Sequence, residues 1–123
     1  ADIVKRVYEK PVDDIDKDDL DIVYMVYSGK FDDYPEFAIG EAFDDFFVSP
    51  RWDVFTASDS TIVVQFNGTA FEEDEGYDIM LQFTVEPDKE SWYVSYFEVD
   101  GNQQELSLLP DLLKYIFTVF SYN

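Results

Sequence analysis

The residue types of this chain offer little to catalysis and much to binding through charge. There is no histidine and no cysteine, which removes the usual general base, the commonest metal ligand, thiol nucleophiles and disulfides. Carboxylates are numerous, but glycosidase-type chemistry needs one acid with a raised pKa in an apolar cleft, and no pattern marks one. The five glycines are scattered, so there is no glycine-rich phosphate loop. We therefore expect a protein that is not an enzyme, with no catalytic residue, no cofactor and no metal site.

The charge of the chain restricts its partners. Asp and Glu number 28 against 8 Lys and Arg, a formal net charge of -20. Such a field repels nucleic acid and anionic membrane surfaces, whereas it attracts a basic protein or a divalent cation. A simpler interpretation is that the acidity keeps an aromatic-rich domain soluble. We therefore expect a protein partner and no nucleic acid; a basic protein is one candidate for the partner, and solubility is the first explanation of the acidity.

The densest run of aspartates, Asp13–Asp21, raises the question of calcium. A helix-loop-helix calcium site requires acids at positions 1, 3 and 5, glycine at 6 and glutamate at 12. Counted from Asp14, the three acids fit, but Asp19 replaces the glycine and Met25 replaces the glutamate. The pattern fails where the geometry is most demanding, so we interpret this run as part of a solvated segment.

Two stretches have the period of amphipathic helices. The first has apolar residues at i, i+3, i+4, i+7 and i+8, namely Ile39, Ala42, Phe43, Phe46 and Phe47. The second repeats this spacing near the end of the chain with Leu109, Leu112, Leu113, Ile116, Phe117 and Phe120. Pro50 prevents continuation of the first helix, and Ser107 is a candidate N-cap for the second. The stripes predict core-facing helices rather than ligand sites.

Between these stretches the period changes to two, which predicts strands. We expect long strands around Ile62–Phe66, Tyr77–Val85 and Trp92–Val99, with a shorter one at Trp52–Thr56. The connections are short, which favours antiparallel hairpins. Ile22–Tyr27 is compatible with a first strand or with the last turns of a helix.

Together these elements predict an α+β fold. An antiparallel sheet of about four strands is packed on one face by two amphipathic helices, and its other face is left partly open. Residues 1–21 are expected to form an acidic lead-in, and residues 22–123 a single domain. No run of the roughly 18 to 20 apolar residues that span a bilayer is present.

Two features are candidates for a partner surface. One is an acidic hairpin tip between the second and third expected strands, and the other is the sheet face opposite the helices. The residues assigned to this surface are Glu72, Glu73, Asp74, Glu75, Met80 and Gln82.

One motif also resembles a known family. Its residues are Tyr34-Pro35, Ile39-Gly40-Glu41-Ala42-Phe43-Asp44, Phe46-Phe47, Pro50 and Trp52. They resemble a motif of small, uncharacterised extracytoplasmic domains of Gram-positive bacteria, which are often membrane-anchored and sometimes carry an N-terminal zinc ribbon. The fold of that family is similar to that of β-lactamase inhibitory proteins. Where the family usually has threonine, this chain has Ala38, which removes a capping box with Glu41.

The resemblance and the charge lead to two functional expectations. The first is a non-enzymatic, extracytoplasmic protein-binding or accessory domain, anchored at the cell surface in the full-length protein. The second is an immunity or inhibitor protein that neutralises a toxin or a basic enzyme through its acidic surface.

Overall fold

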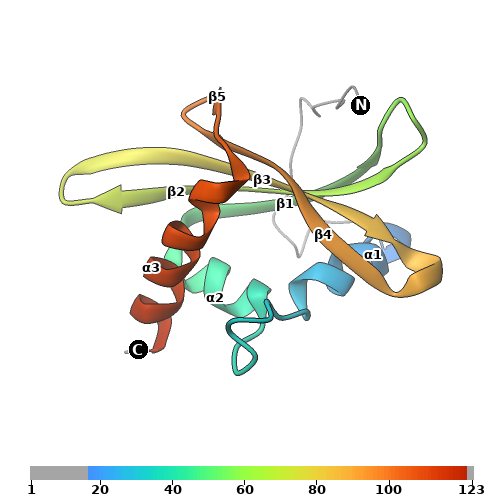
Figure 1. The fold of residues 1–123 in the computed structure, drawn as a ribbon, viewed down its shortest axis with the longest axis horizontal. Helices are drawn as coiled ribbons and strands as arrows, with labels where there is room; N and C mark the ends of the chain where they lie inside the picture. Colours follow the sequence, from blue (N-terminus) through green and yellow to red (C-terminus); the bar gives the residue numbers. More distant parts are fainter. Residues whose placement is uncertain (1–16, 122–123) are drawn as a thin grey trace.

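A computed structural model describes residues 17–121 of the chain, and Figure 1 shows their arrangement. Within this range the strands form one antiparallel sheet in the order β1-β2-β3-β4-β5, so every strand pairs with its neighbour in sequence. Their bounds are β1 Val48–Thr56, β2 Ile62–Glu72, β3 Glu75–Glu86, β4 Ser91–Val99 and β5 Asn102–Gln103. The expected α+β class is confirmed, with five strands instead of about four because β5 is a two-residue pairing that only the folded chain reveals.

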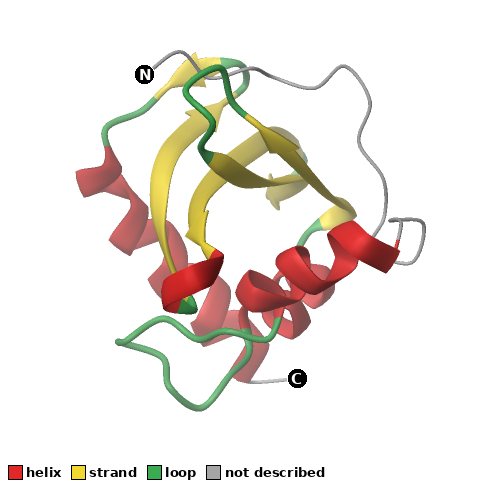
Figure 2. Cartoon of the chain, turned by 90° about the vertical axis from the view of Figure 1, so that its right-hand side faces the viewer, coloured by secondary structure: helices red, strands yellow, loops and turns green. Residues whose placement is uncertain are grey.

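Three α-helices lie on one face of this sheet in the described range, where two were expected (Figure 2). They are α1 Lys17–Tyr27, α2 Ile39–Phe46 and α3 Leu109–Ser121. Two 3-10 turns, Pro87–Lys89 and Leu106–Leu108, complete the elements. The apolar run Ile22–Tyr27 is therefore the end of a helix, and the boundary placed after residue 21 falls inside α1. The rest of the expected lead-in and the first four residues of the calcium-like run lie outside the described residues.

The two predicted helical stripes face a common aromatic core. Phe43 of α2 is fully buried. The distances from its ring centroid to those of four other aromatic rings are between 4.9 and 6.5 Å; these rings belong to Phe66, Phe47, Trp52 and Phe31. Phe46 is only half-buried and lies edge-on to Tyr115 of α3, at 5.5 Å between ring centroids. The apolar face of α2 is thus mainly part of the core, and Phe46 at its margin contacts α3.

Strand β1 begins earlier than its sequence suggested, because a β-bulge accommodates Pro50. The register with β2 shifts between Val48 and Arg51, and Ser49 has a positive φ of 53°. A proline is tolerated here because β1 is an edge strand and proline has no N–H to donate. The bulge lies opposite Gly68, where an added Cβ would lie 2.8 Å from the Cβ of Phe47.

Neither α2 nor α3 begins with a side-chain cap from the residue considered for that role in the sequence. Ala38 is the N-cap of α2 and makes no side-chain capping bond. Ser107 lies in the 3-10 turn before α3, and its hydroxyl donates to Glu105 instead, so the expected N-cap role is wrong. The 3-10 turn starts the helix in its place.

Candidate protein-interaction surface

The β2–β3 hairpin extends beyond the helical layer and ends in an acidic tip (Figure 1). Four consecutive acids form this tip, and all four are exposed: Glu72, Glu73, Asp74 and Glu75. Strand pairing continues to Glu72 and Glu75, so a two-residue connection closes the hairpin. Glu73 takes a positive φ of 58° in that connection. The sequence therefore placed the tip correctly, because a short polar run between two alternating stretches predicts a turn.

The tip carboxylates have no basic partner among residues 17–121. The ion pair in this range joins Lys89 to Glu86 at 3.1 Å, on the opposite end of β3. The Tyr77 hydroxyl donates to Glu75 at 2.7 Å, and this bond is the main reason that the pKa of Tyr77 is raised. Because like charges cluster without neutralisation, the tip presents a local negative potential to solvent.

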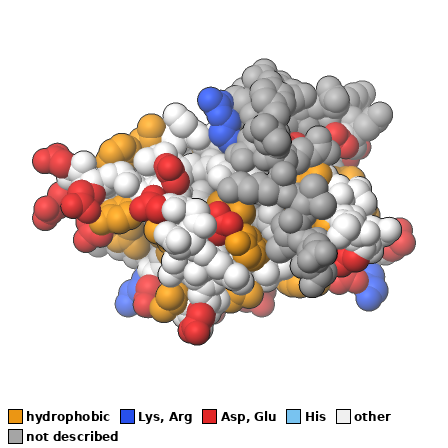
Figure 3. All heavy atoms as spheres, turned by 90° about the horizontal axis from the view of Figure 1, so that it is seen from above, with side chains coloured by type: hydrophobic (Ala, Val, Ile, Leu, Met, Phe, Trp, Pro, Cys, Tyr) orange, Lys and Arg blue, Asp and Glu red, His pale blue; other side chains and the backbone are white. Residues whose placement is uncertain are grey.

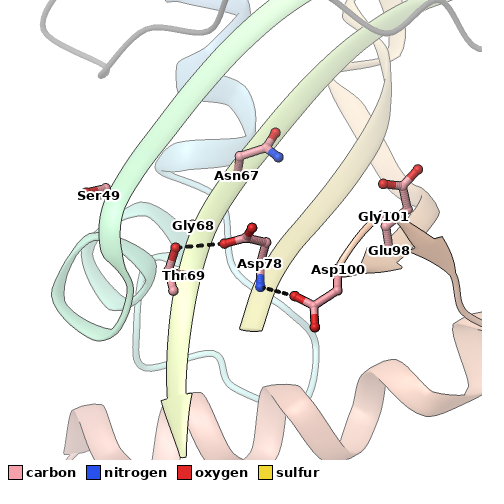
Figure 4. Close-up of a pocket in the computed structure, with 8 residues that line it drawn as sticks. All are labelled: Ser49, Asn67, Gly68, Thr69, Asp78, Glu98, Asp100 and Gly101. Carbon is pink, nitrogen blue, oxygen red and sulfur yellow. Dashed lines mark hydrogen bonds between the residues drawn. The ribbon is translucent and has the colours of Figure 1, made fainter. Parts of the chain in front are cut away.

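A few residues from the tip along β2 and β3, the sheet face opposite the helices contains a hollow of about 420 Å³ (Figure 4). Its lining comes from β1, β2, β3, β4 and the turn after β4: Ser49, Asn67, Gly68, Thr69, Asp78, Glu98, Asp100 and Gly101. Asp78 accepts a hydrogen bond from the Thr69 hydroxyl at 3.0 Å, and its backbone N–H donates to Asp100 at 2.8 Å. The lining contains three carboxylates and no basic residue, so the hollow continues the negative surface of the tip.

These carboxylates do not form a metal site in the described part of the chain. No group of three or more acidic side chains there has the geometry to hold a metal ion. Glu98 is nearly buried and accepts a hydrogen bond from the Tyr96 hydroxyl at 2.6 Å. That bond, together with burial, raises the pKa of Tyr96 to about 12.

An exposed aromatic ring adjoins the acids. Phe71 is 51% exposed and lies on the same sheet face as Thr69, because the two are separated by two residues of one strand. Its ring covers Gly76 of β3, where an added Cβ would lie 3.0 Å from the ring. Figure 3 shows hydrophobic side chains beside the acidic cluster at this end of the molecule. Phe71 was not among the residues predicted for the partner surface, although the alternation of β2 identifies its face.

Met80 and Gln82, the other two residues assigned to the partner surface, are buried. Met80 is 3% exposed and Gln82 is fully buried, so the expectation that they lie on an open face is wrong. Gln82 donates to Gln65 at 2.8 Å, and Gln65 donates to Asn67 at 2.8 Å. These bonds offset part of the cost of burying the two glutamines, although the buried side-chain oxygen of Gln82 accepts no hydrogen bond.

The family-like motif has a structural explanation in this fold. Asp44 accepts hydrogen bonds from the Tyr27 hydroxyl at 2.5 Å and from the Trp52 indole at 3.1 Å. Burial and the bond to Asp44 raise the pKa of Tyr27 well above its ordinary value. Gly40 is required because the Tyr27 ring lies where its Cβ would be, at 2.2 Å. Gly40, Asp44 and Trp52 therefore fasten α1 and α2 to β1.

No protein-family model, curated protein or solved structure matches the chain. The described helices include none with the length and apolar character needed to cross a membrane.

Proposed function

We propose that this chain is a non-enzymatic protein-binding or accessory domain whose partner carries a basic surface. The observation that carries the proposal is the projecting hairpin tip, where four exposed acids lie beside the half-exposed ring of Phe71. Unpaired charge accelerates encounter with an oppositely charged protein, and an exposed aromatic ring can become a buried anchor in the complex. The proposed binding function therefore requires no catalytic residue in this chain.

The proposed location rests on the sequence motif, whereas the alternative function rests on the acidic tip and the net charge. An extracytoplasmic, membrane-anchored position in the full-length protein is proposed from the resemblance of the Tyr34–Trp52 motif to surface domains of Gram-positive bacteria. The alternative function is an immunity or inhibitor protein. It is favoured by the same acidic tip together with the high net charge of this small chain, because a toxin or enzyme with a basic cleft would be its complement.

The test begins with recovery of the partner by cross-linking in the native host, followed by surface plasmon resonance at low and high salt. We expect the association rate to fall steeply as salt rises, because screening shortens the reach of the field to about 10 Å at 0.1 M. Charge reversal of Glu73 and Glu75 to Lys should slow association more than it speeds dissociation.

The matched control reverses Glu36 and Glu105, which are exposed outside the hairpin, so both double variants have the same net charge. A larger effect of the hairpin variant locates the interface at the tip. Equal association rates at both salt concentrations, or equal effects of the two variants, would contradict the proposal. A toxin recovered as the partner and neutralised by the chain would select the alternative.

A further inference from the structure

Strand β4 has an open edge over most of its length within residues 17–121. One side pairs with β3, while β5 pairs on the other side with Glu98 and Val99. The N–H of Gln104 donates to the carbonyl of Phe97 at 2.9 Å, which extends that cover by one residue. No described strand lies beside Ser91 to Tyr96. Every second residue of such an edge directs its N–H and C=O away from the sheet.

The opposite edge of the sheet is different. Strand β1 contains the bulge at Ser49 and the proline at residue 50. A bulge twists an edge away from an incoming strand, and a proline removes a donor. Strand β4 has no proline along its open part. Its pairing with β3 is irregular near Ser95, where the register shifts between Gln82 and Phe83 of β3. This irregularity lies towards the end of β4 that β5 covers.

Side chains along the open part of β4 are suited to recognition. Tyr93 is 53% exposed, whereas Trp92 and Val94 pack against the aromatic core. At the Ser91 end a hollow of about 310 Å³ is lined by Lys30, Phe31, Asp32, Ser91 and Trp92. An added strand gains affinity from main-chain hydrogen bonds and specificity from pockets that receive its alternate side chains.

We propose that the open edge of β4 accepts an extended segment of a basic protein partner as an additional strand. This inference rests on the proposed function as a protein-binding domain and specifies how the partner docks. The partner is basic because the chain carries a charge of -20. A second copy would bring the same charge to the same edge, and this repulsion disfavours self-association.

The test uses random peptides displayed on phage and selected on the full chain. A selected peptide is then synthesised, together with a version that is N-methylated at alternate residues. We expect selected peptides to be rich in Lys or Arg and in β-branched residues. They should also protect from hydrogen exchange those backbone amides between Ser91 and Tyr96 that point away from β3. N-methylation should weaken binding by about tenfold or more, because it removes main-chain donors.

Two tyrosines provide a matched pair of variants. Tyr93 on β4 and Tyr115 on α3 are both 53% exposed. Tyr93→Ala should weaken the peptide several-fold and Tyr115→Ala should not, with circular dichroism verifying that both variants fold. If Tyr93→Ala does not fold, the N-methylated peptide decides the question.

Several outcomes would overturn the inference. Peptides that leave the β4 amides unprotected, or no selection above background, would exclude a strand-receiving edge. The cross-linking test of the proposed function would be unaffected by either result. Protection of the same amides without peptide, rising with protein concentration alongside a dimer in sedimentation, would show that the occupant is a second copy.

Discussion

The hydrogen bonds around Asp44 allow a quantitative test of how this fold is fastened. In Asp44→Ala, the indole N–H of Trp52 loses its acceptor inside a fully buried side chain. An unsatisfied buried donor costs about 1 to 3 kcal/mol. The Tyr27 hydroxyl also loses a charge-assisted bond, but Tyr27 is only half-buried, so water replaces part of it, at a cost of about 1 kcal/mol.

Two smaller effects reduce the total. Alanine has a higher helix propensity than aspartate by about 0.5 kcal/mol. Removal of one negative charge also weakens the self-repulsion of a chain whose net charge is -20. We therefore expect Asp44→Ala to lower the free energy of unfolding by about 1.5 to 3.5 kcal/mol. Urea denaturation followed by circular dichroism measures this value. Asp44→Asn should cost less, because its amide accepts from the indole and donates to the tyrosine oxygen.

The control is Glu41→Ala, which removes one carboxylate from the exposed face of the same helix. It should cost about 0.5 kcal/mol or less, since loss of a favourable charge near the helix N-terminus is offset by better propensity. A double-mutant cycle with Tyr27→Phe should show non-additivity, as expected for residues in contact. Equal costs for Asp44→Ala and Glu41→Ala would refute the assignment of a structural role to Asp44.

Two further predictions concern the core and alkaline pH. Phe43→Ala should cost about 3 to 5 kcal/mol, as for other fully buried aromatic residues, and a loss well under 1 kcal/mol in chemical denaturation would contradict the burial of its ring. For Tyr96, the folded pKa of about 12 exceeds the usual value near 10, so its stabilising contribution is complete below about pH 10 and is lost between about pH 10 and 12. Tyr96→Phe should therefore lose less stability than the wild type between pH 9 and 11.5 in urea titrations, and parallel losses would indicate that the hydroxyl does not bond Glu98.

The local periodicity of the sequence predicted much of the fold for a simple physical reason. Helices and strands repeat every 3.6 and 2 residues, so the spacing of Ile39, Ala42 and Phe43 identifies a buried helical face without any knowledge of its partner. Tyr77–Val85 similarly identifies a strand. The acidic tip followed from the short connection between two such strands.

Where the prediction failed, long-range contacts decide the structure. Alternation along β3 places Met80 and Gln82 opposite the helices, but it does not say how accessible that face is. The hydrogen bond from Gln82 to Gln65 across the strands offsets part of the cost of burying these amides, and this partner is not visible in local spacing. Ile22–Tyr27 was ambiguous because six apolar residues suit a strand as well as a helix. Its contacts with the core select the helix.

The sequence by itself determined the acidity, the absence of nucleophilic and imidazole side chains, the two helical stripes and the acidic hairpin tip. These are properties of composition and short-range spacing, which do not depend on how distant segments meet. Only the tertiary structure joined Tyr27 and Trp52 through Asp44 and, within residues 17–121, left the edge of β4 open. Each of these depends on which strands become neighbours, and that choice follows from packing over the whole chain.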